Sequence, residues 1–176
     1  PQVFGRIGYA RLTTEKIALE AGVSIGSLYN YFNCKEAVVA AYLDRELNEA
    51  LDAVLTAARD QLCTQADFLH KVVDISVDFD FRHAKFLKAL LQSSPELAFC
   101  AVAPESQQTA IEIMSTLQCR ESYRFRERDP DVAAFTLTNI FWGFRYRLAL
   151  LPPDHISMTA IKRELDEIIQ MYLFSP

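Results

Sequence analysis

The chain of 176 residues has no hydrophobic run long enough to cross a membrane and no clustered cysteines. A spanning helix needs roughly 18 consecutive apolar residues, and the first residues lack the charged and apolar regions of a secretory signal. The four cysteines are scattered, without the CxxC pairs of a zinc site or the density of a disulfide scaffold. We therefore expect a cytoplasmic protein with reduced thiols and no metal site.

Patterns typical of catalysis are missing as well. The three histidines show no HExxH spacing, no carboxylate pair suggests acid–base chemistry, and no glycine-rich loop could cradle a phosphate. Glycine and proline are too scarce for a collagen-like or low-complexity chain, whereas 51% of the residues are hydrophobic, enough for a substantial core. The sequence therefore predicts a globular protein that is not an enzyme and needs no cofactor.

The formal net charge of −5 argues at first against a nucleic-acid partner, because phosphate contacts need a basic surface. The charge is unevenly distributed, however. Residues 1–45 contain five basic and four acidic residues, so the acidic excess lies in the remainder of the chain. This asymmetry permits DNA binding by the N-terminal segment but does not establish it.

Apolar residues recur at spacings of three and four along most of the chain, which predicts amphipathic helices and an all-α fold. Capping residues and prolines divide the pattern into segments. The expected helices cover about residues 13–21, 24–32, 35–58, 65–79, 82–93, 104–126, 130–151 and 157–174. Apolar and acidic residues alternate over 77–81, but a lone strand has no partner for its backbone, so we expect a frayed helix end or a loop there.

A segment near the N-terminus has the pattern of a helix-turn-helix. Thr13 or Thr14 can cap its first helix. Gly22 can adopt the left-handed conformation that ends this helix, and Ser24 can cap the second one. The expected small core between the two helices consists of Ile17, Ala18, Ala21, Val23, Leu28 and Phe32. The outward face of the second helix is short and polar or aromatic, which suits a helix in the major groove of DNA.

The same segment resembles the DNA-binding signature of the TetR family of transcriptional regulators. The resemblance is sharp over roughly residues 5–45 and is carried by Gly8-Tyr9, Thr13-Thr14, Ile17-Ala18, Ala21-Gly22-Val23-Ser24, Gly26, Leu28-Tyr29, Tyr31-Phe32 and Lys35-Glu36. It implies a helix-turn-helix domain over residues 1–45. It also implies that a long helix joins this domain to a C-terminal helical domain over residues 46–176, which binds a ligand and dimerises.

The resemblance also implies which residues contact DNA. By analogy, phosphate contacts fall on Thr14, Tyr29, Tyr31 and Lys35, base contacts fall near Ile25, Ser27 and Asn30, and Ser24 and Gly26 complete the interface. The alternative is a structural role. The tyrosines could be core aromatics, and Lys35 with Glu36 could be an exposed charge pair at a helix start.

The sequence departs from the family's pattern at two places. The position after Ser24 is often basic in the family, whereas Ile25 can offer only an apolar contact, for instance to a thymine methyl group. The family's first helix precedes a Gly-Tyr pair, and here only its tail near Val3 and Phe4 is present. We therefore expect further residues upstream of Pro1.

The two C-terminal helices are candidates for a dimer interface. The helix over 130–151 is apolar on several sides, and the helix over 157–174 carries one apolar stripe. Relatives in the TetR family dimerise through an intersubunit four-helix bundle, which the two helices could form. The implied interface residues are Phe141, Phe144, Leu148, Leu165, Ile168, Ile169 and Tyr172.

Aromatic residues between the two modules could line a ligand cavity, because such cavities are mostly apolar with a few polar anchors. The candidates are Phe68, Phe86, Phe99, Trp142 and Arg145; ordinary core packing is the alternative for the aromatics. Arg145 and Arg147 lie in the most apolar helix, where they could anchor an acidic ligand or form ion pairs across an interface. We interpret Arg120, Arg124 and Arg128 as one solvated helix face.

The resemblance predicts a repressor that binds a pseudo-palindromic DNA operator as a homodimer and leaves it when a small-molecule effector binds. One alternative is a helical small-molecule-binding protein with a vestigial helix-turn-helix. An enzyme on a helical bundle has little support, because no nucleophile–base pair or metal cluster is evident in the sequence.

Overall fold

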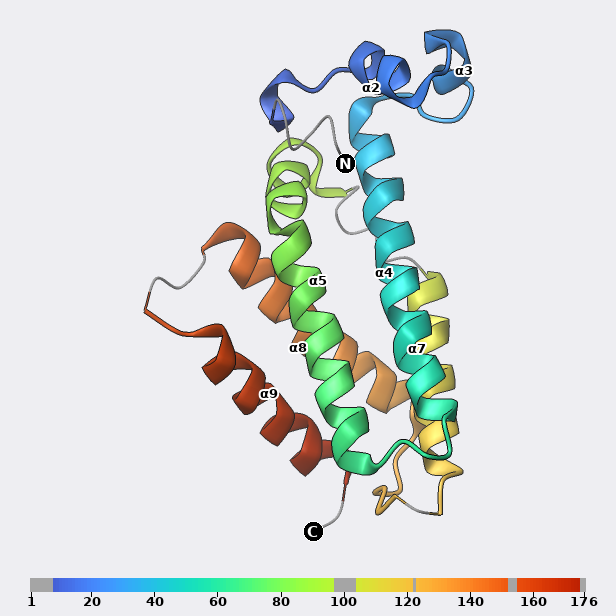
Figure 1. The fold of residues 1–176 in the computed structure, drawn as a ribbon, viewed down its shortest axis with the longest axis vertical. Coiled ribbons are helices and arrows are strands. Elements are labelled where there is room, and N and C mark those ends of the chain that lie inside the picture. Colours follow the sequence, from blue (N-terminus) through green and yellow to red (C-terminus); the bar gives the residue numbers. More distant parts are fainter. Residues whose placement is uncertain (1–7, 97–103, 122, 152–154, 175–176) are drawn as a thin grey trace.

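The computed structural model describes residues 8–96, 104–121, 123–151 and 155–174. Over these residues the chain is helical, and the only strand-like feature described is an isolated bridge between Phe125 and Phe174. The predicted all-α fold is confirmed. The elements are η1 (Tyr9–Arg11), α2 (Thr14–Ala21), α3 (Ile25–Tyr29), α4 (Lys35–Arg59), α5 (Gln65–Ser93), α7 (Pro104–Gln118), α8 (Pro130–Leu150) and α9 (Met158–Leu173) (Figure 1).

Local capping chemistry sets several helix ends where the sequence predicts them. The hydroxyl of Thr13 accepts a hydrogen bond from the backbone N–H of Lys16 and so begins α2. The carboxylate of Asp129 accepts hydrogen bonds from the first backbone N–H groups of α8, directly before a proline at its first turn. The long helix expected over 35–58 is found as α4, so the predicted domain boundary after residue 45 falls inside a helix that both parts share.

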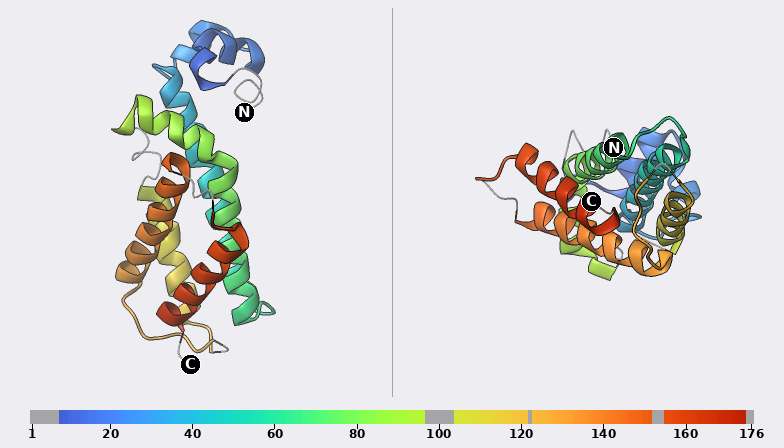
Figure 2. Two further views of the ribbon diagram at one scale, coloured as in Figure 1. Left: turned by 90° about the vertical axis from the view of Figure 1, so that its left-hand side faces the viewer. Right: turned by 90° about the horizontal axis from the view of Figure 1, so that it is seen from below.

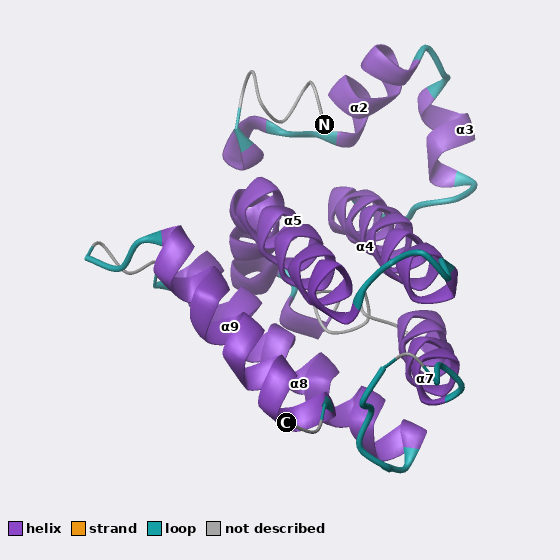
Figure 3. Cartoon of the chain, turned by 60° about the horizontal axis from the view of Figure 1, so that its bottom comes forward, coloured by secondary structure: helices purple, strands orange, loops and turns teal. Residues whose placement is uncertain are grey.

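The long helices form a bundle with the helix-turn-helix at one end. Helix α4 runs away from α2 and α3, and α5 returns beside it in the opposite direction (Figure 1). Helix α7 packs on α4, α8 packs on α5 and α7, and α9 crosses α5 (Figures 2 and 3). The main core lies between these helices. Its most fully buried side chains are Phe68, Val73, Leu117, Leu165, Ile169, Leu173 and Phe174.

A second core joins the helix-turn-helix to the bundle. Its buried members are Leu12, Val39, Leu43, Leu87, Leu90, Leu91 and Ala149, which come from the N-terminal module, α4, α5 and α8. Tyr9 packs against this core, donates a hydrogen bond to Glu36 at 2.8 Å and contacts the hydroxyl of Ser93 at 2.9 Å. The last turns of α5 and α8 therefore hold the helix-turn-helix in place.

Helix α5 is continuous, so the frayed end or loop expected over 77–81 is wrong. The alternation there arises because one acidic residue, Asp80, lies on the buried side of the helix among Val77 and Phe79, while Phe81 is exposed. Asp80 can be buried because it forms an ion pair with Arg145 of α8. A buried charge that has a partner elsewhere in the fold hides the helical period from sequence analysis.

The solvated face predicted for Arg120, Arg124 and Arg128 is wrong at Arg120, and α7 ends at Gln118 instead of near 126. Arg120 is buried, and its guanidinium donates hydrogen bonds to the backbone carbonyls of Ala58, Asp60, Gln61 and Cys63. These carbonyls lie in the last turn of α4 and directly after it, where helical backbone acceptors lack partners. Arg120 therefore closes the turn between α4 and α5.

In the described part of the chain no helix is long and apolar enough to cross a membrane. The described residues also contain no group of three or more His, Cys, Asp or Glu side chains placed to hold a metal ion. Cys34, Cys63 and Cys119 are free thiols, while Cys100 lies outside the described residues.

Candidate nucleic-acid interface and internal cavity

The turn between α2 and α3 has the geometry that the sequence predicts. Gly22 adopts a left-handed conformation with φ of 68°, and its backbone N–H returns to the last carbonyls of α2. Ser24 begins α3, because its hydroxyl accepts a hydrogen bond from the backbone N–H of Ser27 at 2.9 Å. The two hydroxyls of Ser24 and Ser27 also contact each other at 2.8 Å. These bonds fix the direction in which α3 leaves the turn.

The core of the helix-turn-helix is smaller than predicted. Ala18 and Leu28 are buried between the helices, and Ile17 and Phe32 are half-buried. Ala21 and Val23, predicted for the same core, are exposed. The turn points these two side chains outward because they flank Gly22, where the chain reverses.

Most of the residues predicted to contact DNA lie on the outer surface of α3 and of the segment after it. Ile25, Gly26, Ser27 and Asn30 are exposed, and Tyr31 is 83% exposed. A cluster of exposed aromatic and small polar side chains around a short helix leaves room for close approach to a groove. Ser24 belongs to the same surface, but its hydroxyl is engaged in capping α3.

Two of the predicted phosphate-binding residues contact each other. The hydroxyl of Tyr29 lies 3.0 Å from the hydroxyl of Thr14, and either can be the donor. Thr14 is buried at the start of α2, whereas Tyr29 is 51% exposed. The Thr14 hydroxyl therefore orients the tyrosine ring and leaves the phenol oxygen able to accept or donate a further hydrogen bond.

Lys35, the fourth predicted phosphate contact, lies at the start of α4. Its ammonium group is 4.5 Å from the centre of the Tyr9 ring and 4.0 Å from a carboxylate oxygen of Glu36. Burial raises the pKa of Tyr9 to about 12, so this phenol stays neutral and keeps its hydrogen bond to Glu36. Lys35 is consequently held near the helix-turn-helix by an aromatic ring and a carboxylate, and its side chain remains partly exposed.

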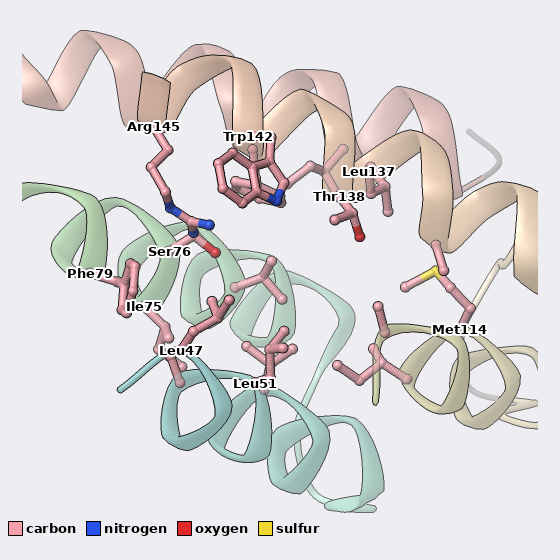
Figure 4. Close-up of a pocket in the computed structure, with 18 of the residues that line it drawn as sticks. Leu47, Leu51, Ile75, Ser76, Phe79, Met114, Leu137, Thr138, Trp142 and Arg145 are labelled. Atoms are coloured by element: carbon pink, nitrogen blue, oxygen red, sulfur yellow. The ribbon is translucent and has the colours of Figure 1, made fainter. Parts of the chain in front are cut away.

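An internal cavity of about 110 Å³ lies between α4, α5, α7, α8 and α9. Its wall is almost entirely apolar, with Leu47 and Leu51 from α4, Met114 from α7 and Phe141 from α8 among the lining residues (Figure 4). The polar exceptions are Ser76, Thr138, Arg145 and the indole of Trp142. Such a composition is typical of a site for a small apolar molecule.

One lining residue of this cavity, Arg145, belongs to a buried ion pair. The Nε of Arg145 donates to a carboxylate oxygen of Asp80 at 2.5 Å, and the two side chains are 9% and 2% exposed. Burial raises the pKa of Asp80, and the neighbouring guanidinium opposes that rise. The guanidinium also lies 4.8 Å from the centre of the Phe79 ring and 5.4 Å from that of Trp142.

His83 lies one turn beyond Asp80 on α5, on the side of the second core. Its ring packs against Phe79 and Tyr42, and its Nε2 is 3.5 Å from a carboxylate oxygen of Glu46 on α4. Burial lowers the pKa of His83, so the neutral ring is favoured. The histidine is thus part of the packing between α4 and α5.

The predicted ligand residues fall into three groups. Phe68, Trp142 and Arg145 line the cavity. Phe86 does not line it and packs with Tyr42 beside the second core. Phe99 lies outside the described residues. Sequence reasoning missed the aliphatic lining from α4 and α7, because one helical stripe looks the same whether it faces a core or a cavity.

The residues predicted for the dimer interface include some that are buried within the protomer and some that are partly or fully exposed. Leu148, Leu165 and Ile169 are buried inside the protomer, so their prediction as interface residues is wrong. Phe141, Phe144 and Tyr172 are half-buried and Ile168 is exposed. Sequence reasoning missed three exposed apolar side chains on the same two helices, Val132, Phe135 and Met171. The face of each helix that turns outward follows from the packing of the whole bundle.

Residues 2–42 match the family described as bacterial regulatory proteins, tetR family. The structure of Thermus thermophilus FadR, a TetR family transcriptional repressor in complex with lauroyl-CoA, is 22% identical over 97% of this chain and 88% of its own, with a TM-score of 0.68. The fatty acid degradation regulator FadR from Bacillus halodurans is 19% identical over 96% and 88%, with a TM-score of 0.65. The SmeT–triclosan complex is 18% identical over 98% and 86%, with a TM-score of 0.59. Identities this low show a shared fold.

Curated proteins contain no match to this chain. The match over residues 2–42 covers the helix-turn-helix and the start of α4. It therefore confirms the resemblance that the sequence shows in this segment.

Proposed function

We propose that this chain, a TetR-family transcriptional regulator, is a cytoplasmic repressor that binds a pseudo-palindromic operator as a homodimer and is released by a small-molecule effector. The family consists of regulators, so the chain is not an enzyme. The observation that carries the proposal is the exposed surface of α3 and of the segment after it, where Ser27, Asn30 and Tyr31 are exposed next to the Thr14–Tyr29 pair.

DNA binding would place α3 in the major groove. Hydroxyl and ammonium groups of Tyr29, Tyr31 and Lys35 would contact phosphates on either side, and Ile25 with Asn30 would face base edges. Phosphate contacts position the protein, whereas the base contacts select the sequence. An isoleucine at this point favours operators that present a thymine methyl group.

A gel-shift experiment with the DNA that flanks the protein's own gene tests this proposal. We expect binding whose affinity falls at least about tenfold between roughly 50 and 200 mM salt, because neutralised phosphates release counterions. A salt-insensitive complex would contradict the phosphate contacts. Absence of any complex with this DNA would favour the alternative of a helical small-molecule-binding protein with a vestigial helix-turn-helix.

The homodimer is proposed to form through α8 and α9. Val132 and Phe135 lie three residues apart on α8, and Ile168 and Met171 do so on α9, so each pair shares one helix face. Single exposed apolar residues are ordinary, but large apolar side chains that recur on one face indicate an interaction surface. A two-fold dimer would hold two α3 helices about one DNA turn, or a multiple, apart.

Phe135→Glu is expected to weaken the dimer by about 2 kcal/mol or more, because it puts a charge into an apolar contact. The measurement is sedimentation equilibrium over a range of protein concentrations. Leu62→Glu is the matched control, since Leu62 is also apolar and exposed but lies in the turn between α4 and α5. A Phe135→Glu protein that dimerises as tightly as the wild type would exclude this face of α8.

Effector release is proposed to act through α5 and α8. Both helices line the cavity, and both end in the second core that holds the helix-turn-helix. A molecule that fits one arrangement of these helices better than the other would change the separation of the two α3 helices. The lauroyl-CoA and triclosan bound by FadR and SmeT, two proteins of the same fold, support a small-molecule effector.

A further inference from the structure

The wall of the internal cavity is apolar except at Ser76, Thr138, the indole of Trp142 and Arg145, whose buried partner Asp80 is not itself a lining residue. Among the described residues, the guanidinium of Arg145 has one hydrogen-bond acceptor, the Asp80 carboxylate, which it contacts through Nε. No described side chain or carbonyl accepts from its two terminal nitrogens. The side chain reaches from α8 toward Ser76 on α5, where it forms part of the cavity wall (Figure 4). The cavity therefore offers unused N–H donors at one end.

The charge at this end is already balanced. The contact of 2.5 Å with the guanidinium favours the ionised form of Asp80, so that Asp80 and Arg145 together are neutral, and both are almost completely buried. The groups around them do not change this balance. Burial favours the neutral form of His83, and the carboxylate of Glu46 faces this histidine, with one oxygen 3.5 Å from its Nε2. A carboxylate ligand would add a third charge to a buried, mostly apolar site and leave one negative charge uncompensated, which is costly.

A neutral hydrogen-bond acceptor has no such cost. A ketone or ester oxygen can accept from the terminal N–H groups of Arg145 while Asp80 keeps its own bond to Nε. The hydrogen bond would be charge-assisted and therefore stronger than one between neutral groups. The rest of the ligand would be an apolar body that fills the space between α4, α5, α7 and α8.

We infer that Asp80 sets the specificity of the cavity, so that the effector is a neutral apolar molecule with a carbonyl-type acceptor and not a carboxylate of the same size. This inference rests on the proposed function, since it concerns the effector cavity. Arg145 taken alone suggests a receptor for acids. Its buried partner turns it into a hydrogen-bond donor for uncharged ligands.

The first test compares matched probes on the wild-type full chain at neutral pH. Butyrophenone, 4-phenylbutyrate and butylbenzene share a phenyl ring and a short alkyl chain, and differ in carrying a ketone, a carboxylate or no polar group. Trp142, the sole tryptophan of the sequence, lines the cavity, so its fluorescence reports occupancy. We expect butyrophenone to bind at least about tenfold more tightly than either of the other probes.

The second test removes the charge of Asp80. In Asp80→Asn, 4-phenylbutyrate should gain at least about tenfold in affinity, because Arg145 then lacks a counterion, and butyrophenone should change little. Asp78→Asn is the matched control: this carboxylate lies on the exposed side of the same helix and pairs with Lys162 at 3.0 Å. It should leave the order of the probes unchanged. If Asp80→Asn does not fold, the wild-type comparison still decides.

The possible failures can be told apart. If 4-phenylbutyrate binds the wild type as tightly as butyrophenone, Asp80 does not exclude carboxylates and the inference is wrong. The proposed effector cavity is then unaffected. If butylbenzene binds as tightly as butyrophenone, Arg145 does not donate to the ligand. The inference is then wrong, while the proposed effector cavity is unaffected. If none of the probes changes Trp142 fluorescence or the melting temperature, the proposed effector cavity fails, and this inference fails with it.

Discussion

Tyr29→Ala is expected to reduce operator binding by at least about 100-fold, because a dimer loses two phosphate contacts that are each worth about 1.5–3 kcal/mol. The ring is 51% exposed and contributes little to the core of the helix-turn-helix. Helicity and the dimer should therefore remain as in the wild type. The measurements are gel shift with the flanking DNA, circular dichroism and sedimentation.

Tyr29→Phe separates the hydroxyl from the ring. It keeps the packing of the ring against α2 and removes only the oxygen that contacts Thr14 at 3.0 Å. We expect a loss close to that of Tyr29→Ala, because the same charged hydrogen bond is removed from each protomer. Leu62→Ala, at the far end of α4, is the control and should bind like the wild type. Unchanged binding by Tyr29→Ala would remove the tyrosine from the interface and leave α3 without its best phosphate contact.

The parts of the fold that could be predicted from the sequence depend on residues close in the chain. Ser24 caps α3 through a backbone group three residues later, and Gly22 ends α2 because of its own conformation. The same holds for Asp129 at the start of α8. Such contacts are present in any short segment of sequence, so the helix-turn-helix and most helix boundaries could be predicted before the fold was known.

The parts that could not be predicted depend on pairs of residues far apart in the chain. Asp80 and Arg145 are separated by 65 positions, and each alone looks like a misplaced charge in an apolar helix. Their ion pair allows Asp80 to be buried within a continuous α5 and holds Arg145 in the cavity wall. The apolar stripe of α9 shows the same limit, because only packing determines that Ile169 faces the core and Ile168 the outside.

Arg120 shows this limit most clearly, and its replacement is expected to have a large effect on stability. Arg120→Ala should lower the free energy of unfolding by about 3 kcal/mol, because it removes the donor of several buried or half-buried carbonyls at the end of α4. Two of these acceptors retain another partner, since Cys63 N–H donates to Asp60 and the Tyr123 hydroxyl donates to Cys63. The measurement is urea denaturation followed by circular dichroism.

Arg59→Ala provides the matched control. Arg59 is the neighbouring arginine at the end of α4, it is more than half exposed, and its ion pair with Glu112 lies at the surface. Surface pairs contribute at most about 1 kcal/mol, so this variant should unfold close to the wild type. Arg120→Lys should fall between the two, because one ammonium group cannot match the planar set of donors. Equal stability of Arg120→Ala and Arg59→Ala would mean that water satisfies the carbonyls of this turn, and that Arg120 is not what joins α4 to α5.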